Sequence, residues 1–336
     1  MNMKQWLENI KQTPRKKPMP ILSFPSVSLL DVTVKELTDS SELQANGMKR
    51  IADSKETLAS VSMMDLSVEA EAFGAQVRFS DDEVPTVIGA LVTSPQEAEA
   101  LAVPDIKAAR CGKYIKAAQT ACTLITDRPV FAGVIGPFSL AGRLMDVSEA
   151  MIYCYTEPEM VHTVLQKATD FLIQYIGAYK ESGAHGVVMA EPLTGMLSPD
   201  LAKEFSEGYV RQIVEAVQED DFLVIYHNCG NNVLLMMDSI LSTKAAAYHF
   251  GNAVSMKEVL LNVPSDTVVM GNVDPAGQIR SGTPESVKAE TKRILSECYV
   301  YPNFVISSGC DIPPASPWEN IDAFFEAVEE FYNENA

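Results

Sequence analysis

The chain has 336 residues, enough for two average domains or for one large α/β domain. Its 26 lysine and arginine residues stand against 45 aspartate and glutamate residues, a formal charge of −19, so the surface repels nucleic acid and anionic membranes, and we expect neither as a partner. The N-terminus has no signal-peptide pattern and no apolar run reaches about 18 residues, so we expect a cytoplasmic protein.

Seven short runs of β-branched and other apolar residues follow one another along the chain, and each is typical of a buried strand. They occupy residues 20–26, 129–138, 186–192, 222–229, 245–251, 267–273 and 303–310. Amphipathic stretches lie between them, and the longest, from Met160 to Tyr179, has apolar residues at steps of three and four that predict a helix. Residues 27–128 have a mostly helical pattern, with one weak strand at residues 75–80.

The alternation of strands and helices is not interrupted by a Gly/Ser-rich linker or a block of charge, which favours one parallel α/β domain over residues 1–336. Two architectures accommodate the pattern: a (β/α)8 TIM barrel with an N-terminal helical extension, and an open doubly wound sheet. We predict the barrel, because polar residues with ligand chemistry stand at the carboxyl ends of successive strands, where barrels build their active sites.

A histidine and two cysteines are the most informative of these strand-end residues. The run 222–229 ends in Tyr-His-Asn-Cys, and residues i and i+2 of a strand point to the same side, so we expect His227 and Cys229 to face together. Cys310 ends another strand at the same face. One imidazole and two thiolates suit zinc, and three protein ligands with an open fourth position are typical of catalytic zinc. The alternative is a buried histidine beside two inert thiols.

Glu191 ends the run 186–192, which precedes the His/Cys strand in the chain. We predict it as a fourth, displaceable oxygen ligand of the metal, and the alternative is a loop carboxylate paired with a lysine or arginine. His185 and His249 stand alone in their runs, and we interpret both as structural histidines. The four remaining cysteines lie in predicted helices and are interpreted as small hydrophobic residues.

Three motifs, in order, carry a resemblance to a known family: YHNCG at 226–230, GNVDP at 271–275, and residues 307–328, which begin SSGCDIPP. They resemble the uroporphyrinogen decarboxylase superfamily, and the His-x-Cys and later Cys resemble its zinc methyltransferase branch, which includes the methylcobamide:coenzyme M methyltransferases. The resemblance runs over most of the chain and implies one barrel of that type with a funnel-shaped mouth. The decarboxylase itself is less similar, because residues 20–26 contain no arginine where that enzyme has an arginine-rich N-terminal motif.

The methyltransferase branch implies zinc, a small thiol such as coenzyme M, and a methylcobalamin-type corrinoid as co-substrate, often on a separate corrinoid protein. The sequence FSDD is similar to a decarboxylase strand that presents an aspartate to the macrocycle, so Ser80, Asp81 and Asp82 are expected to line the mouth near a corrinoid ring. A helix cap is the alternative for these residues. Asp274 of GNVDP either faces the funnel or shapes an Asp-Pro turn.

We therefore expect a zinc-dependent corrinoid methyltransferase in which a zinc-bound thiolate attacks the methyl group of a methylcorrinoid, with His227, Cys229, Cys310 and Glu191 as the catalytic residues. Transfer in the opposite direction, from a methoxylated compound or a methylamine to a corrinoid protein, stays open. A lyase like uroporphyrinogen decarboxylase and a non-catalytic binder of metal or of a corrinoid protein are further alternatives. The oligomeric state is left open by these patterns.

Overall fold

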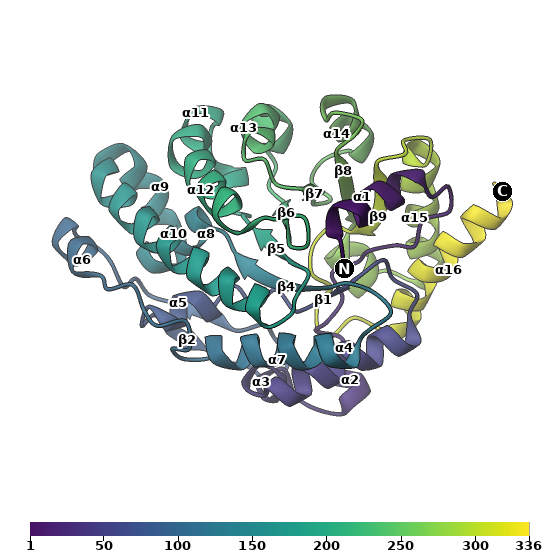
Figure 1. Cartoon of the computed structure of the whole chain (residues 1–336), viewed down its shortest axis with the longest axis horizontal. Coiled ribbons are helices and arrows are strands. Elements are labelled where there is room, and N and C mark those ends of the chain that lie inside the picture. The colour runs from purple at the N-terminus through teal and green to yellow at the C-terminus, as the bar shows by residue number, and fades with distance from the viewer. Residues whose placement is uncertain (336) are drawn as a thin grey trace.

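The computed structural model describes residues 1–335, and within them the main sheet is a curved array of seven strands with helices arranged around it (Figure 1). All neighbouring strands of this sheet are parallel. In spatial order the strands are β1 (Ser60–Val61), β4 (Val130–Ile135), β5 (Gly186–Ala190), β6 (Leu223–Asn228), β7 (Ala247–Phe250), β8 (Val268–Val273) and β9 (Phe304–Ser308).

The helices fall into an N-terminal group and a group that connects the strands. The N-terminal group consists of α1 (Met3–Gln12), α2 (Ser26–Leu30), α3 (Val34–Asp39) and α4 (Ser41–Ser54). The connecting and closing helices are α5 (Val68–Ala72), α6 (Pro95–Ala100), α7 (Cys111–Leu124), α8 (Pro137–Met145), α9 (Val147–Thr156), α10 (Pro158–Glu181), α11 (Pro199–Ala202), α12 (Gly208–Val217), α13 (Met237–Ser242), α14 (Met256–Asn262), α15 (Pro284–Cys298) and α16 (Trp318–Glu334). Short turns η1 (Thr194–Met196), η2 (Lys203–Glu207), η3 (Val233–Met236) and η4 (Pro275–Arg280) complete the chain's helical segments within the described range.

An extended segment, residues 18–22, occupies the gap between the first and last strands of the sheet. Met19 donates its backbone N–H to Ile306 of β9 at 3.0 Å, and Leu58, just before β1, donates to the carbonyl of Pro18 at 2.9 Å. The prediction of a regular strand over residues 20–26 is wrong, because Pro18 and Pro20 have no N–H to donate to a ladder and Ser26 already begins α2. The segment nevertheless stands in the place of the eighth strand, and the predicted TIM barrel is confirmed over the open doubly wound sheet.

The weak strand expected at residues 75–80 does form, but outside the barrel. β2 (Gln76–Arg78) pairs antiparallel with β3 (Thr86–Ile88) in a separate hairpin. The barrel strand of this region is β1, which has two residues and pairs with β4, and the sequence pattern did not reveal it. So short a strand leaves too few residues for an apolar run or an alternation to be recognised.

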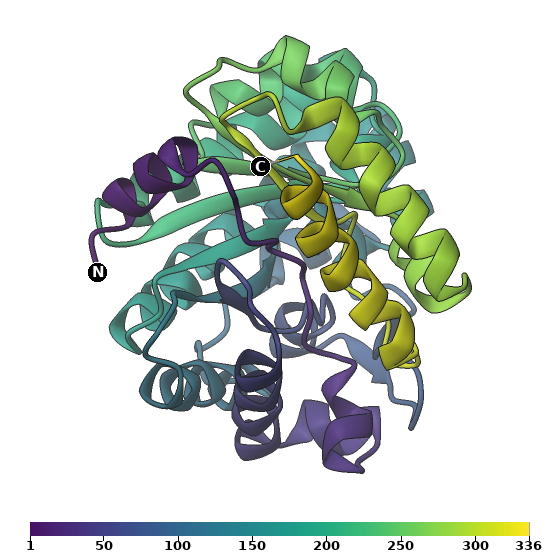
Figure 2. The same cartoon turned by 90° about the vertical axis from the view of Figure 1, so that its right-hand side faces the viewer.

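The predicted N-terminal helical extension is present, and α1 closes the amino-terminal end of the barrel (Figure 2). Met3 donates its backbone N–H at 2.7 Å to the carbonyl of Asp220, which precedes β6, and Lys11 reaches the carbonyl of Asp266 before β8 at 2.9 Å. Met3 and Ile10 are almost fully buried against the inner residues of the strands. Burying side chains of this size stabilises the closure by about 1.5–3 kcal/mol each.

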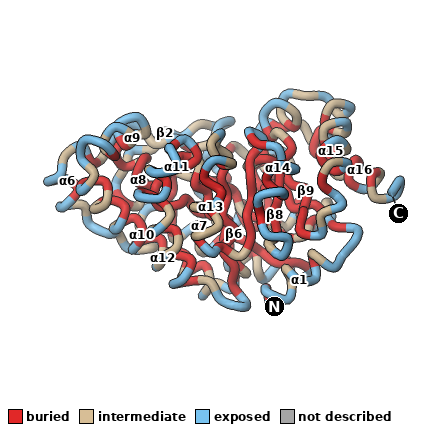
Figure 3. The backbone as a smooth tube through the Cα atoms, turned by 90° about the horizontal axis from the view of Figure 1, so that it is seen from above, coloured by how far each residue is buried: buried red, intermediate tan, exposed pale blue. Residues whose placement is uncertain are grey.

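Alternate residues of each strand point into the barrel, where they form a continuous apolar core. In Figure 3 the tube is coloured as buried along strands such as β6, β8 and β9. Val188 of β5, Ile225 of β6, Ala247 of β7, Met270 of β8 and Val305 of β9 belong to this inner cluster. The next inward positions along β6, β7 and β9 are polar, so the core gives way to a site at the carboxyl end. Among residues 1–335 no helix combines the length and the apolar character needed to cross a bilayer.

Candidate metal centre

The carboxyl ends of β6 and β9 bring three potential metal ligands together. His227 is the fifth residue of β6, Cys229 follows that strand, and Cys310 follows β9. One ligand atom from each of the three lies within 4.8 Å of the other two. Gly251 makes room for this approach, because a Cβ at that position would overlap the side chain of Cys229. The structure therefore brings together the three side chains that the strand pattern placed at one face.

The ring of His227 is held by a second histidine on the neighbouring strand. The register pairs His227 of β6 with His249 of β7, and the two Nδ1 atoms lie 2.8 Å apart. The Nε2 atom of His227 is buried and has no hydrogen-bond partner within residues 1–335. Because Nδ1 is engaged with His249, Nε2 is the nitrogen that remains available to a metal.

The two thiols form a coupled pair. A hydrogen bond from Cys310 lowers the pKa of Cys229 well below its usual range, against the opposing effect of burial, and His227 lowers it further. The same hydrogen bond, together with burial, raises the pKa of Cys310. Cys229 is therefore the sulfur of the pair that more readily becomes a thiolate, which is the form that binds a cation.

These observations fit a zinc ion. A buried imidazole nitrogen without a partner and the sulfurs of two cysteines converge within the reach of a single ion, and nitrogen with sulfur is the donor set that zinc prefers. A buried polar atom with no partner costs about 1–3 kcal/mol, so the arrangement is explained if a ligand completes it. The inert-thiol interpretation leaves the Nε2 atom unexplained.

Glu191 lies directly after β5 and next to the metal centre. Its backbone N–H donates to the carbonyl of His227 at 2.8 Å, which continues the pairing of β5 with β6. Its fully buried carboxylate caps the first turn of α8, where it accepts from the backbone N–H groups of Phe138 at 2.7 Å and Ser139 at 3.0 Å. The hydroxyls of Ser139 and Thr194 also donate to it, at 2.8 and 3.1 Å. Burial raises the pKa of Glu191 to about 7, although these hydrogen bonds oppose the shift.

Glu191 is not one of the three residues whose ligand atoms cluster, and its role as a fourth metal ligand stays a prediction. Within the described residues its partners are amides and hydroxyls, so the alternative of a loop carboxylate paired with lysine or arginine does not describe it. A glycine at position 136 is required here, because a Cβ would overlap the Glu191 side chain.

Ser80, Asp81 and Asp82 lie in the turn of the β2–β3 hairpin, where both aspartates are exposed. Ser80 Oγ donates to Asp82 at 2.6 Å, and no helix begins there, so the turn is not a helix cap. The hairpin contacts a segment at the carboxyl end of the barrel, because Glu83 pairs with Arg280 of η4, after β8, at 3.0 Å. The expected position at the mouth is compatible with this placement.

Asp274 follows β8 and holds the start of η4. Its Oδ1 atom accepts from the backbone N–H groups of Ala276 at 3.0 Å and Gly277 at 2.9 Å. The side chain is partly exposed. Asp274 therefore shapes the Asp-Pro turn, one of the two expectations for it, at the start of the segment that the hairpin contacts through Arg280.

Two further polar residues at the centre were missed. His249 was interpreted as a lone structural histidine, yet it contacts His227, and Ser307 of β9 lies behind it with Oγ 2.8 Å from His249 Nε2. The available signal is the repeated Tyr-His pair, Tyr226-His227 and Tyr248-His249, in consecutive strands of the barrel. Burial, with repulsion from the His227 ring, holds the pKa of His249 well below its usual range, so the ring is neutral. His185 is structural as expected, since its Nδ1 accepts from the backbone of Val130 at 3.2 Å.

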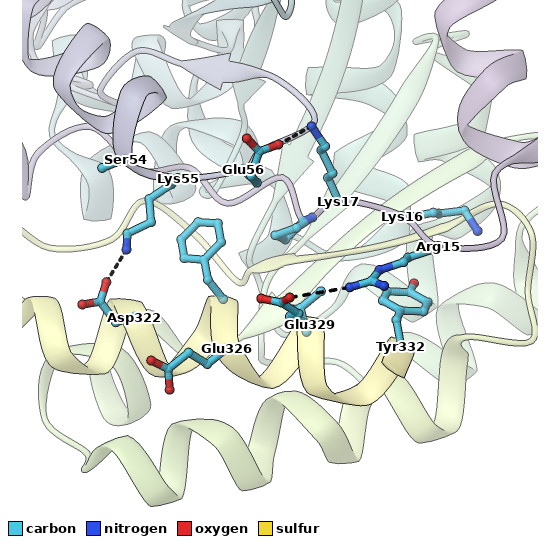
Figure 4. A pocket seen from close by; sticks show the side chains of 13 residues that line it. Arg15, Lys16, Lys17, Ser54, Lys55, Glu56, Asp322, Glu326, Glu329 and Tyr332 are labelled. Atoms are coloured by element: carbon cyan, nitrogen blue, oxygen red, sulfur yellow. Dashed lines mark hydrogen bonds and ion pairs between the residues drawn. The ribbon is translucent and has the colours of Figure 1, made fainter. Parts of the chain in front are cut away.

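A cavity of about 570 Å³ lies elsewhere, between residues 15–18, the segment before β1, and α16 (Figure 4). Three of its four basic residues have acidic partners: Lys17 pairs with Glu56, Lys55 with Asp322, and Arg15 approaches Glu329 at 3.9 Å. The fourth, Lys16, forms no ion pair within residues 1–335. This cavity contains none of the metal-centre residues, so we do not assign the site to it.

Comparison with known proteins gives a consistent picture. A family model described as Uroporphyrinogen decarboxylase (URO-D) matches residues 28–331. The Methylcobamide:CoM methyltransferase MtbA of Methanosarcina mazei is 26% identical over 96% of this chain and 97% of its own length. A uroporphyrinogen decarboxylase of Alcanivorax borkumensis is also 26% identical, over 81% of this chain and 78% of its own. A solved structure, a methyltransferase from Methanosarcina mazei, shares the fold with a TM-score of 0.85 over 98% of both chains, at 23% identity.

Proposed function

The chain belongs to the uroporphyrinogen decarboxylase family and is a methyltransferase, and from that premise we propose that it transfers a methyl group between a corrinoid and a small thiol at a zinc centre. The observation that carries the proposal is the cluster of His227, Cys229 and Cys310, in which the His227 Nε2 atom is buried without a partner within the described chain. Relatives that span it almost end to end are named methylcobamide:CoM methyltransferases, whose names state both the methyl carrier and the acceptor.

His227, Cys229 and Cys310 would hold the zinc and leave the fourth position to the substrate. Zinc bound there would supply a Lewis acid that lowers the pKa of a substrate thiol, so that its sulfur is a nucleophile at neutral pH. In the overall reaction a sulfur electron pair forms the new S–CH3 bond, and the thiol proton is released. The Co–C bond breaks with its electron pair left on cobalt, so Co(III) becomes Co(I), and no other oxidant or reductant is required.

The protein's own contribution is to orient the reactants and to shield them. The imidazole nitrogen and the sulfurs sit at the inner end of the mouth, above an apolar barrel core. Glu191, as a fourth ligand, would exchange its hydrogen bonds to the α8 amides for the metal when no thiol is present. Its hydrogen-bond partners are amides and hydroxyls, so the carboxylate would gain a cationic partner by binding the metal.

We assign the corrinoid to the outer part of the mouth, near Ser80 and Asp81 of the hairpin turn and Asp274 before η4. The Glu83–Arg280 pair supports this assignment, because it ties the hairpin to the same segment that Asp274 begins. A corrinoid protein presenting its cofactor here would place the methyl group over the metal centre. Such a partner is proposed from the chemistry that the centre requires.

The experiment that tests the proposal is a methyl-transfer assay on purified protein with its zinc retained. Methylcobalamin and coenzyme M are supplied, loss of the methylcobalamin absorbance is followed, and the methyl thioether is identified by mass spectrometry. We expect a rate that chelation of zinc abolishes and that added zinc restores. The opposite direction is measured in parallel with Co(I) corrinoid and methylamines or methoxylated compounds as donors.

The curated decarboxylase relatives motivate a matched control with uroporphyrinogen as substrate. Decarboxylation by protein that contains no zinc, without methyl transfer in either direction, would return the chain to the decarboxylase activity of its family. Stoichiometric zinc with neither activity would point instead to a non-catalytic binder.

A further inference from the structure

Behind the metal centre, a line of polar groups crosses the interior of the barrel from β6 to the N-terminal segment. His227 of β6 contacts His249 of β7, His249 contacts Ser307 of β9, and the Ser307 hydroxyl donates to the carbonyl of Met19. All four residues are at most 2% exposed. The Nδ1–Nδ1, Nε2–Oγ and Oγ–O distances are 2.8, 2.8 and 2.7 Å, so each contact is a hydrogen bond of ordinary length.

The direction of each hydrogen bond follows from the end of the line at the Met19 carbonyl. The Met19 carbonyl can only accept, so the Ser307 hydroxyl proton lies between the two oxygens. The contact between Ser307 and His249 then needs a proton from the ring, which places a hydrogen on His249 Nε2. A neutral imidazole carries one such hydrogen, so His249 Nδ1 has a free electron pair and acts as an acceptor toward His227.

The contacts of His227, at the other end of the line, indicate the same position for the ring hydrogen. His227 Nδ1 faces not only His249 Nδ1 but also the backbone carbonyl of His249, at 3.3 Å. A carbonyl oxygen offers no proton, so this contact is a hydrogen bond only when His227 Nδ1 carries the hydrogen. Both ends therefore require the His227 tautomer with hydrogen on Nδ1 and a free electron pair on Nε2, the atom that has no partner within residues 1–335.

From this geometry we infer that His249 and Ser307 are positioning residues that fix the tautomer and the ring orientation of His227, so that its Nε2 electron pair is presented to the metal. The inference rests on the proposed zinc centre for its purpose, but the tautomer follows from the hydrogen bonds alone. A ring nitrogen that must bind a metal cannot also carry a hydrogen, and without the line the two neutral tautomers of His227 would compete. The Met19 carbonyl makes the N-terminal segment part of the metal centre's support.

The test separates the acceptor role of His249 from its bulk. His249→Phe keeps a ring of similar size but has no acceptor for His227 and no donor for Ser307. His249→Asn puts a side-chain oxygen close to the former Nδ1 position and so keeps the acceptor. We expect zinc affinity, measured by competition with a chromophoric chelator, to fall about 10–100-fold in His249→Phe and to stay within about threefold of the native value in His249→Asn.

Ser307→Ala is a milder variant that leaves both histidines in place. It tests the same positioning role if His249→Phe does not fold. It removes the acceptor that keeps the hydrogen on His249 Nε2, and we expect a smaller loss of zinc affinity, about threefold to tenfold. The direct readout is NMR of metal-free protein with isotopically labelled histidine. We expect the native His227 to carry its hydrogen on Nδ1 and to become a mixture of tautomers in Ser307→Ala.

The outcomes distinguish this inference from the proposed function. Native protein that binds zinc, together with His249→Phe and Ser307→Ala proteins that bind it equally well, would overturn the positioning role and leave the zinc centre standing. If native protein bound no zinc, the proposed function would fail, and the NMR result would decide the tautomer by itself. A hydrogen on Nε2 of native His227 would refute the inference in either case.

Discussion

At the amino-terminal end of the barrel, α1 covers the strands with Met3 and Ile10, while at the carboxyl end the same inner face carries His227, His249 and Ser307. The first end is closed by apolar contacts and main-chain hydrogen bonds. The second contains buried polar atoms that have no partner within residues 1–335, among them His227 Nε2, Glu69 Oε2 and Asp311 Oδ1. The same strands thus carry an apolar surface at the amino-terminal end of the barrel and a polar surface at the carboxyl end.

This difference shows how the barrel separates stability from chemistry. An apolar closure gains free energy from burial, whereas each unpartnered buried polar atom costs about 1–3 kcal/mol. The mouth can retain such atoms because the opposite end and the inner core stabilise the fold without them. Removing a proposed metal ligand at the mouth should therefore act mainly on metal binding, and truncating the apolar closure at the other end should act mainly on unfolding.

The largest effect is expected from Cys310→Ala at the mouth. Removing one of three ligands leaves a nitrogen and one sulfur, and we expect zinc affinity to fall by at least about 100-fold. The matched control is Cys298→Ala in α15, where burial raises the pKa of the thiol to about 12 and keeps it inert. Metal analysis of both purified proteins should give about one zinc per chain in the control and almost none in Cys310→Ala. Equal zinc in the two would remove Cys310 from the centre.

The three clustered side chains could be predicted because each lies at, or just after, the carboxyl end of a recognisable apolar strand. Parallel strands of one barrel present their carboxyl ends on one face, so strand-end position is enough to bring His227, Cys229 and Cys310 near one another. The roles of His249 and Glu191 depend on information that is not local. His249 acts through the register that pairs it with His227, and the Glu191 carboxylate meets a helix that begins more than fifty residues earlier.

The fold was predictable to the same extent. Strong apolar runs gave β4 to β9, whereas β1 is too short to leave a pattern and residues 18–22 replace a strand without forming a regular ladder. Pro18 and Pro20 explain that exception, since each lacks the N–H that a ladder position needs. The β2–β3 hairpin has strand-like residues but pairs only within itself, and local sequence does not state which partner a strand will find.

An intermediate effect is expected from Ile10→Ala at the closed end. Ile10 is 3% exposed, and truncating a buried aliphatic side chain costs about 2–5 kcal/mol through lost burial and the cavity left behind. Urea unfolding should show this loss, while zinc affinity should stay within about threefold of native, because no metal ligand lies on α1. Lys4→Ala, on an exposed position of the same helix, should change the stability by less than about 1 kcal/mol. A large fall in zinc affinity in Ile10→Ala would contradict the separation of the two ends.

The smallest effect is expected from Glu69→Gln at the mouth, and it depends on pH. Glu69 accepts one hydrogen bond, from the backbone N–H of Ile135 at 3.0 Å, and burial raises its pKa from 4.5 to about 7. The folded protein therefore keeps a proton on this carboxyl between about pH 4.5 and 7 that the unfolded chain has released. Its contribution to stability is fully present below pH 4.5 and is lost as the pH rises through 7.

Glutamine resembles the protonated carboxyl and does not titrate, so Glu69→Gln should remove this part of the pH dependence. Against native protein at pH 5, the variant should differ little in unfolding free energy, and at pH 8 it should be the more stable by on the order of 2 kcal/mol. The measurement is urea unfolding of metal-free protein at both pH values. Glu191 and Asp311, whose pKa values burial also raises, titrate in both proteins, so their effect cancels in the difference. If the difference in unfolding free energy is the same at pH 5 and pH 8, Glu69 is ionised in the folded protein. The mouth would then tolerate a buried charge, whereas the core at the closed end of the barrel is apolar.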